Sequence, residues 1–132
     1  MRTPADQPKW MTYTGWAFSV LVILFMLMDL TMKYLQLPIV ITTTEGLGWP
    51  AASVVPLAII LTVCTLLYAW PQAAVLGAIL LTGYLGGAVA THMRIGSPLF
   101  SHELFGVYLG LFAWGGLFLR DARLRALIPL RR

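Results

Sequence analysis

The chain has 132 residues, of which 59% are hydrophobic and only 11% are charged, with a formal net charge of +4. Soluble domains carry roughly a quarter of charged residues, so this composition excludes a soluble globular domain and favours an integral membrane protein. The single cysteine, Cys64, lies inside an apolar run, which excludes a disulfide framework.

Four apolar segments are long enough to cross a bilayer, which takes roughly 20 residues in a helix. They are continuous apolar blocks rather than alternating ones, and lipid admits only helices or closed barrels, so strands are not expected. The sequence therefore predicts one all-α membrane domain over residues 1–132, a transmembrane four-helix bundle. The expected helices cover about residues 13–33, 49–68, 72–92 and 103–119.

Three features of the chain bear on the first helix and on how the helices are connected. The first apolar segment follows Arg2 and Lys9 as in a signal peptide, but no small-residue cleavage pattern follows it, so we expect it to remain a helix. Pro71 marks a tight turn at 69–72 between the second and third helices. The longer connection, 34–50, contains the apolar run "LPIVI" and is expected to hold a short re-entrant or interfacial piece.

The distribution of lysine and arginine predicts the orientation of the bundle. With four crossings, both termini and the 69–72 turn share one side of the membrane. That side holds seven basic residues, whereas the opposite side holds only Lys33 and Arg94. The positive-inside rule therefore places both termini in the cytoplasm. The seven basic residues are Arg2, Lys9, Arg120, Arg123, Arg125, Arg131 and Arg132.

The basic tail, residues 120–132, lies directly after the last helix. Anionic lipid headgroups account for such a tail, at about 1 kcal/mol per basic residue near the membrane surface. Membrane lipids are therefore the expected partners of this segment, and nucleic acid is not.

Most of the remaining ionisable groups are expected at the opposite, outer face. Asp29 falls within the outer third of the apolar region, where a carboxylate costs about 2.5–3.5 kcal/mol on insertion scales and marks a candidate functional site. Lys33, four residues later, lies on the same helical face and offers a purely structural ion pair as the alternative. The candidate ligand-binding residues at this face are Asp29, Lys33, His92, Arg94, His102 and Glu103.

The histidines and Arg94 also have plainer interpretations. His92 is more often an interfacial cap than a proton carrier, and Arg94 is most simply an anchor to lipid headgroups. His92 and His102 are ten residues apart, a spacing that matches no compact metal-ligand pattern, so no metal site is expected.

Glycine spacing predicts which helices pack together. Gly83 and Gly87 lie four residues apart in the third helix, and Gly106 and Gly110 do so in the fourth. This spacing lets two helix backbones approach closely in lipid. We therefore expect the third and fourth helices to pack through these glycine faces.

One stretch of the chain carries a family resemblance. The run "GAILLTGYLGGAVATHMRIGSPLFSH", followed by "YLG", "WGG" and "LRDARLRALIP", closely resembles the DoxX-like family of small bacterial membrane proteins. The resemblance is dense from Pro50 to Pro129 and implies a four-helix bundle in the bacterial inner membrane. Leu61 stands where many relatives have a glutamate, which leaves Asp29 as the only acid well inside the apolar region.

Two classes of function stay open, and the family resemblance points to the first. In the first, the protein is an accessory or quinone-binding subunit of a membrane redox system, with His92 bonded to a quinone carbonyl, Arg94 near developing charge and Asp29 relaying a proton. In the second, it is a non-catalytic scaffold or a binder of small solutes. The sequence shows no intrinsic cofactor, so electron transfer would require redox partner subunits; assembly with further copies of the chain is open.

The predicted topology can be tested with reporter fusions. A reporter placed after Arg132 and one inserted between residues 40 and 48 should report opposite sides of the membrane, with the C-terminal reporter in the cytoplasm. A shared side would contradict the four-crossing arrangement.

Overall fold

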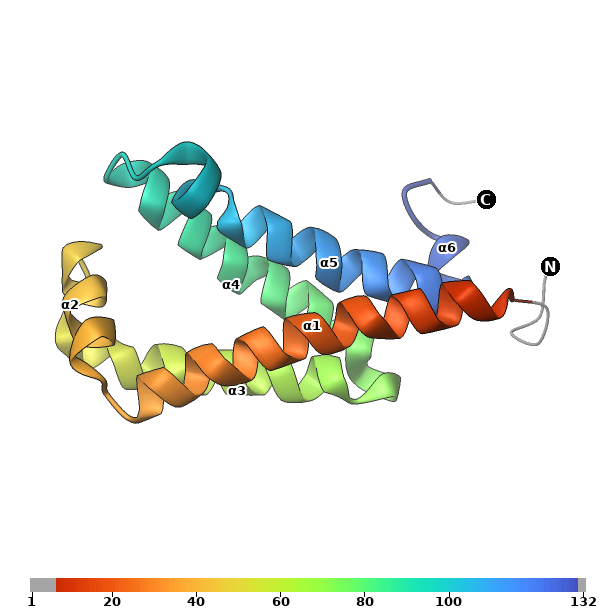
Figure 1. Ribbon diagram of the computed structural model, residues 1–132, viewed down its shortest axis with the longest axis horizontal. Coiled ribbons are helices and arrows are strands. Elements are labelled where there is room, and N and C mark those ends of the chain that lie inside the picture. The colour runs from red at the N-terminus through yellow and green to blue at the C-terminus, as the bar shows by residue number, and fades with distance from the viewer. Residues whose placement is uncertain (1–6, 131–132) are drawn as a thin grey trace.

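The computed structural model describes residues 7–130, which form helices joined by short connections. Within this range four helices are long and apolar enough to span a membrane, which confirms the predicted all-α transmembrane fold. Figure 1 shows them side by side as a bundle. They are α1 (Lys9–Tyr34), α3 (Val54–Ala69, preceded by the 3₁₀ turn Ala51–Ser53), α4 (Ala74–Arg94, preceded by the 3₁₀ turn Pro71–Ala73) and α5 (Phe105–Arg120, preceded by the π-helical turn Leu99–Glu103).

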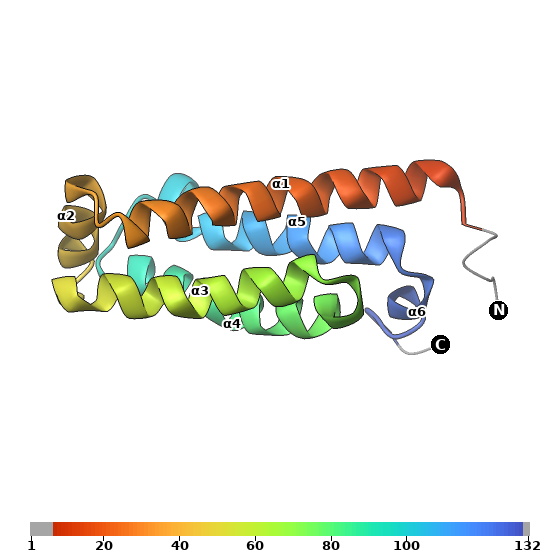
Figure 2. The ribbon, with the colours of Figure 1, turned by 90° about the horizontal axis from the view of Figure 1, so that it is seen from below.

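Two short helices lie at opposite ends of this bundle. Helix α2 (Pro38–Gly46) occupies the connection in which a short interfacial piece was expected, and α6 (Ala122–Arg125) lies in the basic tail. Figures 1 and 2 place α6 at the end of the bundle where α1 begins, far from α2. We call these the terminal end and the α2 end.

Both described chain ends therefore lie at one end of the bundle, as four crossings require. The cytoplasmic assignment of that end stays a prediction from the charge distribution. Three of the residues that support it, Arg2, Arg131 and Arg132, lie outside the described residues.

Helices α1 and α5 approach each other closely near the terminal end. A Cβ atom added to Gly116 would lie 2.8 Å from the carbonyl oxygen of Gly15 and 2.5 Å from the hydroxyl oxygen of Ser19. A Cβ added to Gly15 would lie 2.7 Å from the carbonyl oxygen of Gly116. Because carbon cannot approach oxygen so closely, this crossing requires glycine on both helices.

A buried hydroxyl network reinforces this crossing. The Tyr68 hydroxyl donates to the carbonyl oxygen of Ala113 at 2.7 Å, which uses its one proton. The Ser19 hydroxyl, 2.9 Å away, therefore donates to the Tyr68 oxygen. Ser19 and Tyr68 are almost fully buried, where an unpaired hydroxyl would be costly. The network joins α1, α3 and α5.

Helices α4 and α5 are neighbours, as predicted, but the predicted glycine contact is wrong at three of its four positions. Only Gly106 is at the contact, where an added Cβ would lie 2.9 Å from the carbonyl oxygen of Leu85. A Cβ added to Gly83, Gly87 or Gly110 would meet no atom within 4 Å.

The helical phase explains this correction. The buried positions of α4 include Leu81 and Leu85, and Gly83 and Gly87 each follow one of these by two residues. Two residues correspond to about 200° around a helix, so both glycines lie on a different face from the packed one. The spacing of small residues shows that two helix backbones can approach closely. It does not show on which face of the helix they do so.

Gly116→Ala should destabilise the bundle, whereas Gly110→Ala, on the same helix, should not. The added methyl at 116 collides with the α1 backbone, and overpacking of this kind costs about 1–3 kcal/mol. The methyl at 110 meets open space, and alanine is the better helix former by about 1 kcal/mol. Denaturation of the purified protein in detergent measures the difference; equal stabilities would contradict the crossing.

Candidate functional site

A cavity of about 610 Å³ lies at the α2 end of the bundle. The buried residues of α1 end at Met26 and those of α4 end at Leu85, so both helices are more exposed towards this end. Side chains of α1, α3, α4 and α5 line the cavity, and α2 contributes one wall. Most of these side chains are apolar, so the cavity combines a hydrophobic interior with a few polar groups. The ionisable residues that line it are Asp29, Lys33, Tyr84, His92 and His102.

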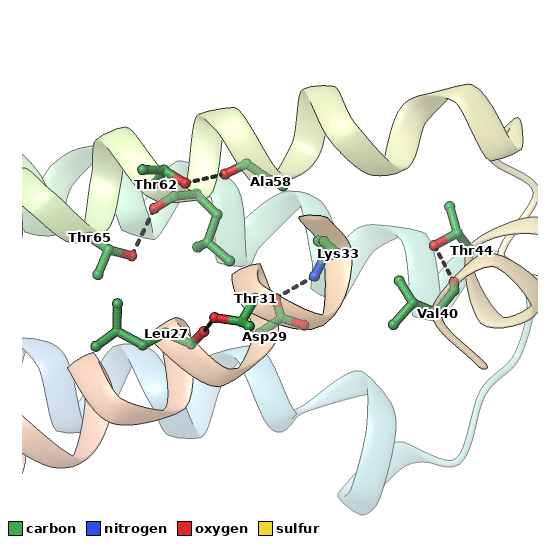
Figure 3. A network of polar contacts seen from close by, with 10 residues as sticks. Leu27, Asp29, Thr31, Lys33, Val40, Thr44, Ala58, Thr62 and Thr65 are labelled. Carbon is green, nitrogen blue, oxygen red and sulfur yellow. Dashed lines mark hydrogen bonds and ion pairs between the residues drawn. The ribbon is translucent and has the colours of Figure 1, made fainter. Parts of the chain in front are cut away.

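Asp29 and Lys33 form an ion pair at the cavity wall. The Lys33 ammonium donates to Oδ2 of Asp29, one helical turn earlier (Figure 3). The Lys33 side chain is 13% exposed and that of Asp29 is 29% exposed, so the pair keeps limited access to its surroundings. The Asp29–Lys33 ion pair that the spacing predicts as a structural alternative is therefore present. Both residues also line the cavity.

The two histidines lie together although ten residues separate them in the sequence. Their ring centroids are 5.8 Å apart. Nδ1 of His92 is 3.0 Å from the Ser97 hydroxyl, and Nδ1 of His102 is 2.7 Å from the Ser101 hydroxyl. These bonds leave Nε2 of each ring as the nitrogen able to bind a ligand, because a neutral imidazole has one donor and one acceptor nitrogen.

Arg94 and Glu103 do not line this cavity. The Arg94 side chain is exposed, and its Nη2 donates to the carbonyl oxygen of Leu47 at 2.7 Å. Glu103 is half-buried in the π-helical turn before α5. The predicted constellation of Asp29, His92 and Arg94 is therefore corrected, since the structure brings Asp29 and His92 to one cavity and engages Arg94 elsewhere.

The threonine hydroxyls around the cavity donate hydrogen bonds within their own helices. Each donates to the carbonyl oxygen four residues earlier, as hydroxyls in apolar helices commonly do. Their protons are therefore already used, and the main donors left for a ligand come from the ion pair, the histidines and Tyr84. Figure 3 shows two of these bonds. They include Thr31 to Leu27, Thr43 to Ile39, Thr44 to Val40 and Thr91 to Gly87, at 2.6 to 2.8 Å.

No pattern in the sequence singled out Tyr84, Ser97 or Ser101. Tyr84 lies between glycines in an apolar run, where an aromatic residue is ordinarily a packing residue. Each serine lies within five residues of the histidine that it contacts, and this proximity is the one available signal. Among residues 7–130, no group of three or more histidine, cysteine, aspartate or glutamate side chains is placed to hold a metal ion.

The fold and the cavity define a small membrane protein of four spanning helices with a ligand-sized hollow at one end. The family model of the DoxX-like family matches residues 17–116, which is most of the chain. The chain therefore belongs to the DoxX-like family. No curated protein and no solved structure gives a significant match to it.

Double-mutant cycles should separate the partners of Asp29. Asp29→Asn and Lys33→Gln should be non-additive by more than about 0.5 kcal/mol, because removing either partner leaves the other charge unpaired in an apolar region. Asp29→Asn and Arg94→Gln should be additive within about 0.5 kcal/mol, because no contact joins them. Unfolding free energies in mixed micelles provide the measurement, and the reverse pattern would contradict the assignment.

Proposed function

We propose that this protein binds the headgroup of a lipophilic quinone in the cavity at the α2 end, as an accessory subunit of a membrane redox system. One observation carries the proposal: a mostly apolar cavity within the spanning helices is lined by two adjacent histidines and an ion pair. Small-molecule sites have this character, with volumes of about 300–1,000 Å³ and a few convergent polar groups.

The chemistry of a quinone headgroup matches these groups. A quinone is a flat apolar ring with two carbonyl oxygens that accept hydrogen bonds. An Nε2–H of His92 or His102 and the Lys33 ammonium are suitable donors, and Asp29 is a suitable acceptor for a hydroxyl of the reduced form. Phe25 and Phe105, which also line the cavity, offer apolar contact to the ring.

The chain itself supplies little for electron transfer. It has one cysteine and two histidines, and the sequence contains no dinucleotide-binding fingerprint. Oxidation or reduction of a bound quinone therefore requires a partner subunit that holds the redox cofactor. The charge distribution supports a cavity at the outer side of the bacterial inner membrane, with both termini cytoplasmic.

The alternative of a non-catalytic scaffold has less support. A scaffold needs an exposed surface for its partners, and it needs no hollow lined by ionisable groups within its spanning helices. Ionisable groups are expensive at membrane depth, so their presence there favours a functional site.

Gly87→Leu should weaken quinone binding, and Gly86→Leu is its matched control. A side chain added at either position meets no atom within 4 Å of its Cβ, so both variants should fold. Gly87 lines the cavity and Gly86 does not, so only leucine at 87 occupies ligand space. The expected loss of affinity is about tenfold or more, from steric overlap of the kind that costs 1–3 kcal/mol.

Titration of nanodisc-embedded protein with a short-chain quinone measures this effect through quenching of tryptophan fluorescence, because Trp49 lines the cavity. Saturable binding by the wild type and by Gly86→Leu is expected. Absence of saturable binding by the wild type, or equal binding by all three proteins, would contradict the proposal.

A further inference from the structure

Helix α2 is the least embedded wall of the cavity. Several of its side chains and the following Leu47 line the cavity, yet most residues of α2 are exposed and Thr44 is its one fully buried residue. Its main helix contacts are with the turn Ala51–Ser53 and the start of α3. Figure 1 shows α2 across the end of the bundle rather than among the spanning helices.

Residues in the left-handed backbone region lie on both sides of α2. Gln36, two residues before the helix, has a φ of 50°, and Gly48, two residues after it, has a φ of 88°. Segment motions commonly use a few residues at the ends of elements to absorb the backbone rotation. Gly48 is suited to this because glycine populates positive and negative φ about equally.

One side chain ties α2 to the rest of the bundle at the Gly48 side. Arg94, the last residue of α4, donates from Nη2 to the carbonyl oxygen of Leu47 at 2.7 Å. A Cβ added to Gly48 would overlap this same Nη2. Glycine at 48 therefore satisfies two independent requirements, a left-handed backbone and room for the guanidinium.

We propose that α2 is a lid over the cavity, with Arg94 as the positioning residue that holds it closed and Gln36 and Gly48 as its hinges. The inference rests on the proposed function, since the lid gives the quinone its route in and out. Arg94 thus controls access to the site without touching the ligand. A hydrogen bond from a charged group shifts such an opening equilibrium by about ten- to a hundredfold, which suits a closed lid that can still open.

Hydrogen exchange of the full-length protein in nanodiscs tests the lid without any ligand. In Arg94→Gln, amides of residues 39–48 should exchange about tenfold faster than in the wild type, while amides of α1 and α3 stay unchanged. Gly48→Ala should give the same pattern, and combining it with Arg94→Gln should add little. Arg94→Lys should restore most of the protection, because the latch uses a single donor.

Arg123→Gln is the matched control, because it removes an exposed arginine of α6 at the opposite end of the bundle. It should leave exchange of residues 39–48 unchanged. The lid proposal would be overturned if the Arg94→Gln variant exchanged this segment as slowly as the wild type does. It would also be overturned if Arg123→Gln accelerated exchange of the segment by the same factor.

Stopped-flow binding of the short-chain quinone separates a lid from a ligand contact. With a lid, Arg94→Gln should raise the association and dissociation rate constants by a similar factor and leave Kd nearly unchanged. A weaker Kd with an unchanged association rate constant would instead make Arg94 a ligand contact and overturn the inference. If the wild type binds no quinone, the proposed function fails, and the exchange experiment still decides whether α2 opens.

Discussion

The contact of α1 with α5 at Gly15 and Gly116 is the constraint on which the rest of the structure depends. It brings the two backbones together near the terminal end, where the Ser19–Tyr68–Ala113 network holds α3 against them. Towards the α2 end the same two helices meet through Phe25 and Phe105, whose ring centroids are 5.1 Å apart. From the glycine crossing the two helices diverge towards the α2 end, so the pair has a narrow and a wide end (Figure 1). The cavity lies at the wide end.

The terminal end is closed by the arginines of the tail. Arg125 donates to the carbonyl oxygens of Phe118 and Leu119 at 2.7 and 2.9 Å, so it satisfies acceptors that the end of α5 leaves free. The Arg120 guanidinium lies 3.9 Å from the ring centroid of Trp16 on α1, in a cation–π contact. Part of the basic charge that predicts lipid contact thus also stabilises the bundle. The two ends therefore differ in kind, one rigidly closed and one hollow.

Much of the fold could be predicted from the sequence, because long apolar runs leave a chain few choices in a bilayer. The Asp29–Lys33 pair follows from their spacing of four residues, and the topology alone brings His92 and His102 to one end. The face on which α4 packs could not be predicted from its glycines. Their spacing shows that a close contact is sterically possible, but it does not determine which face of the helix points to a neighbour. The partner of Arg94 depends on where α2 lies, which is a tertiary property without a local signal.

The cavity itself also lacked a sequence signal. It lies where α1 and α5 diverge from their glycine crossing, and a glycine crossing alone is ordinary in a membrane protein. Its polar lining is assembled from α1, α4 and the turn before α5, so no continuous motif records it.

The central claim is that the α2 end holds a lipophilic ligand with a polar headgroup. Purification in mild detergent, followed by native mass spectrometry and extraction of the bound lipids, tests it most directly. A retained isoprenoid quinone, bound one per chain and enriched over its share of the membrane lipids, is expected. Only bulk phospholipids, in their membrane proportions, would contradict it.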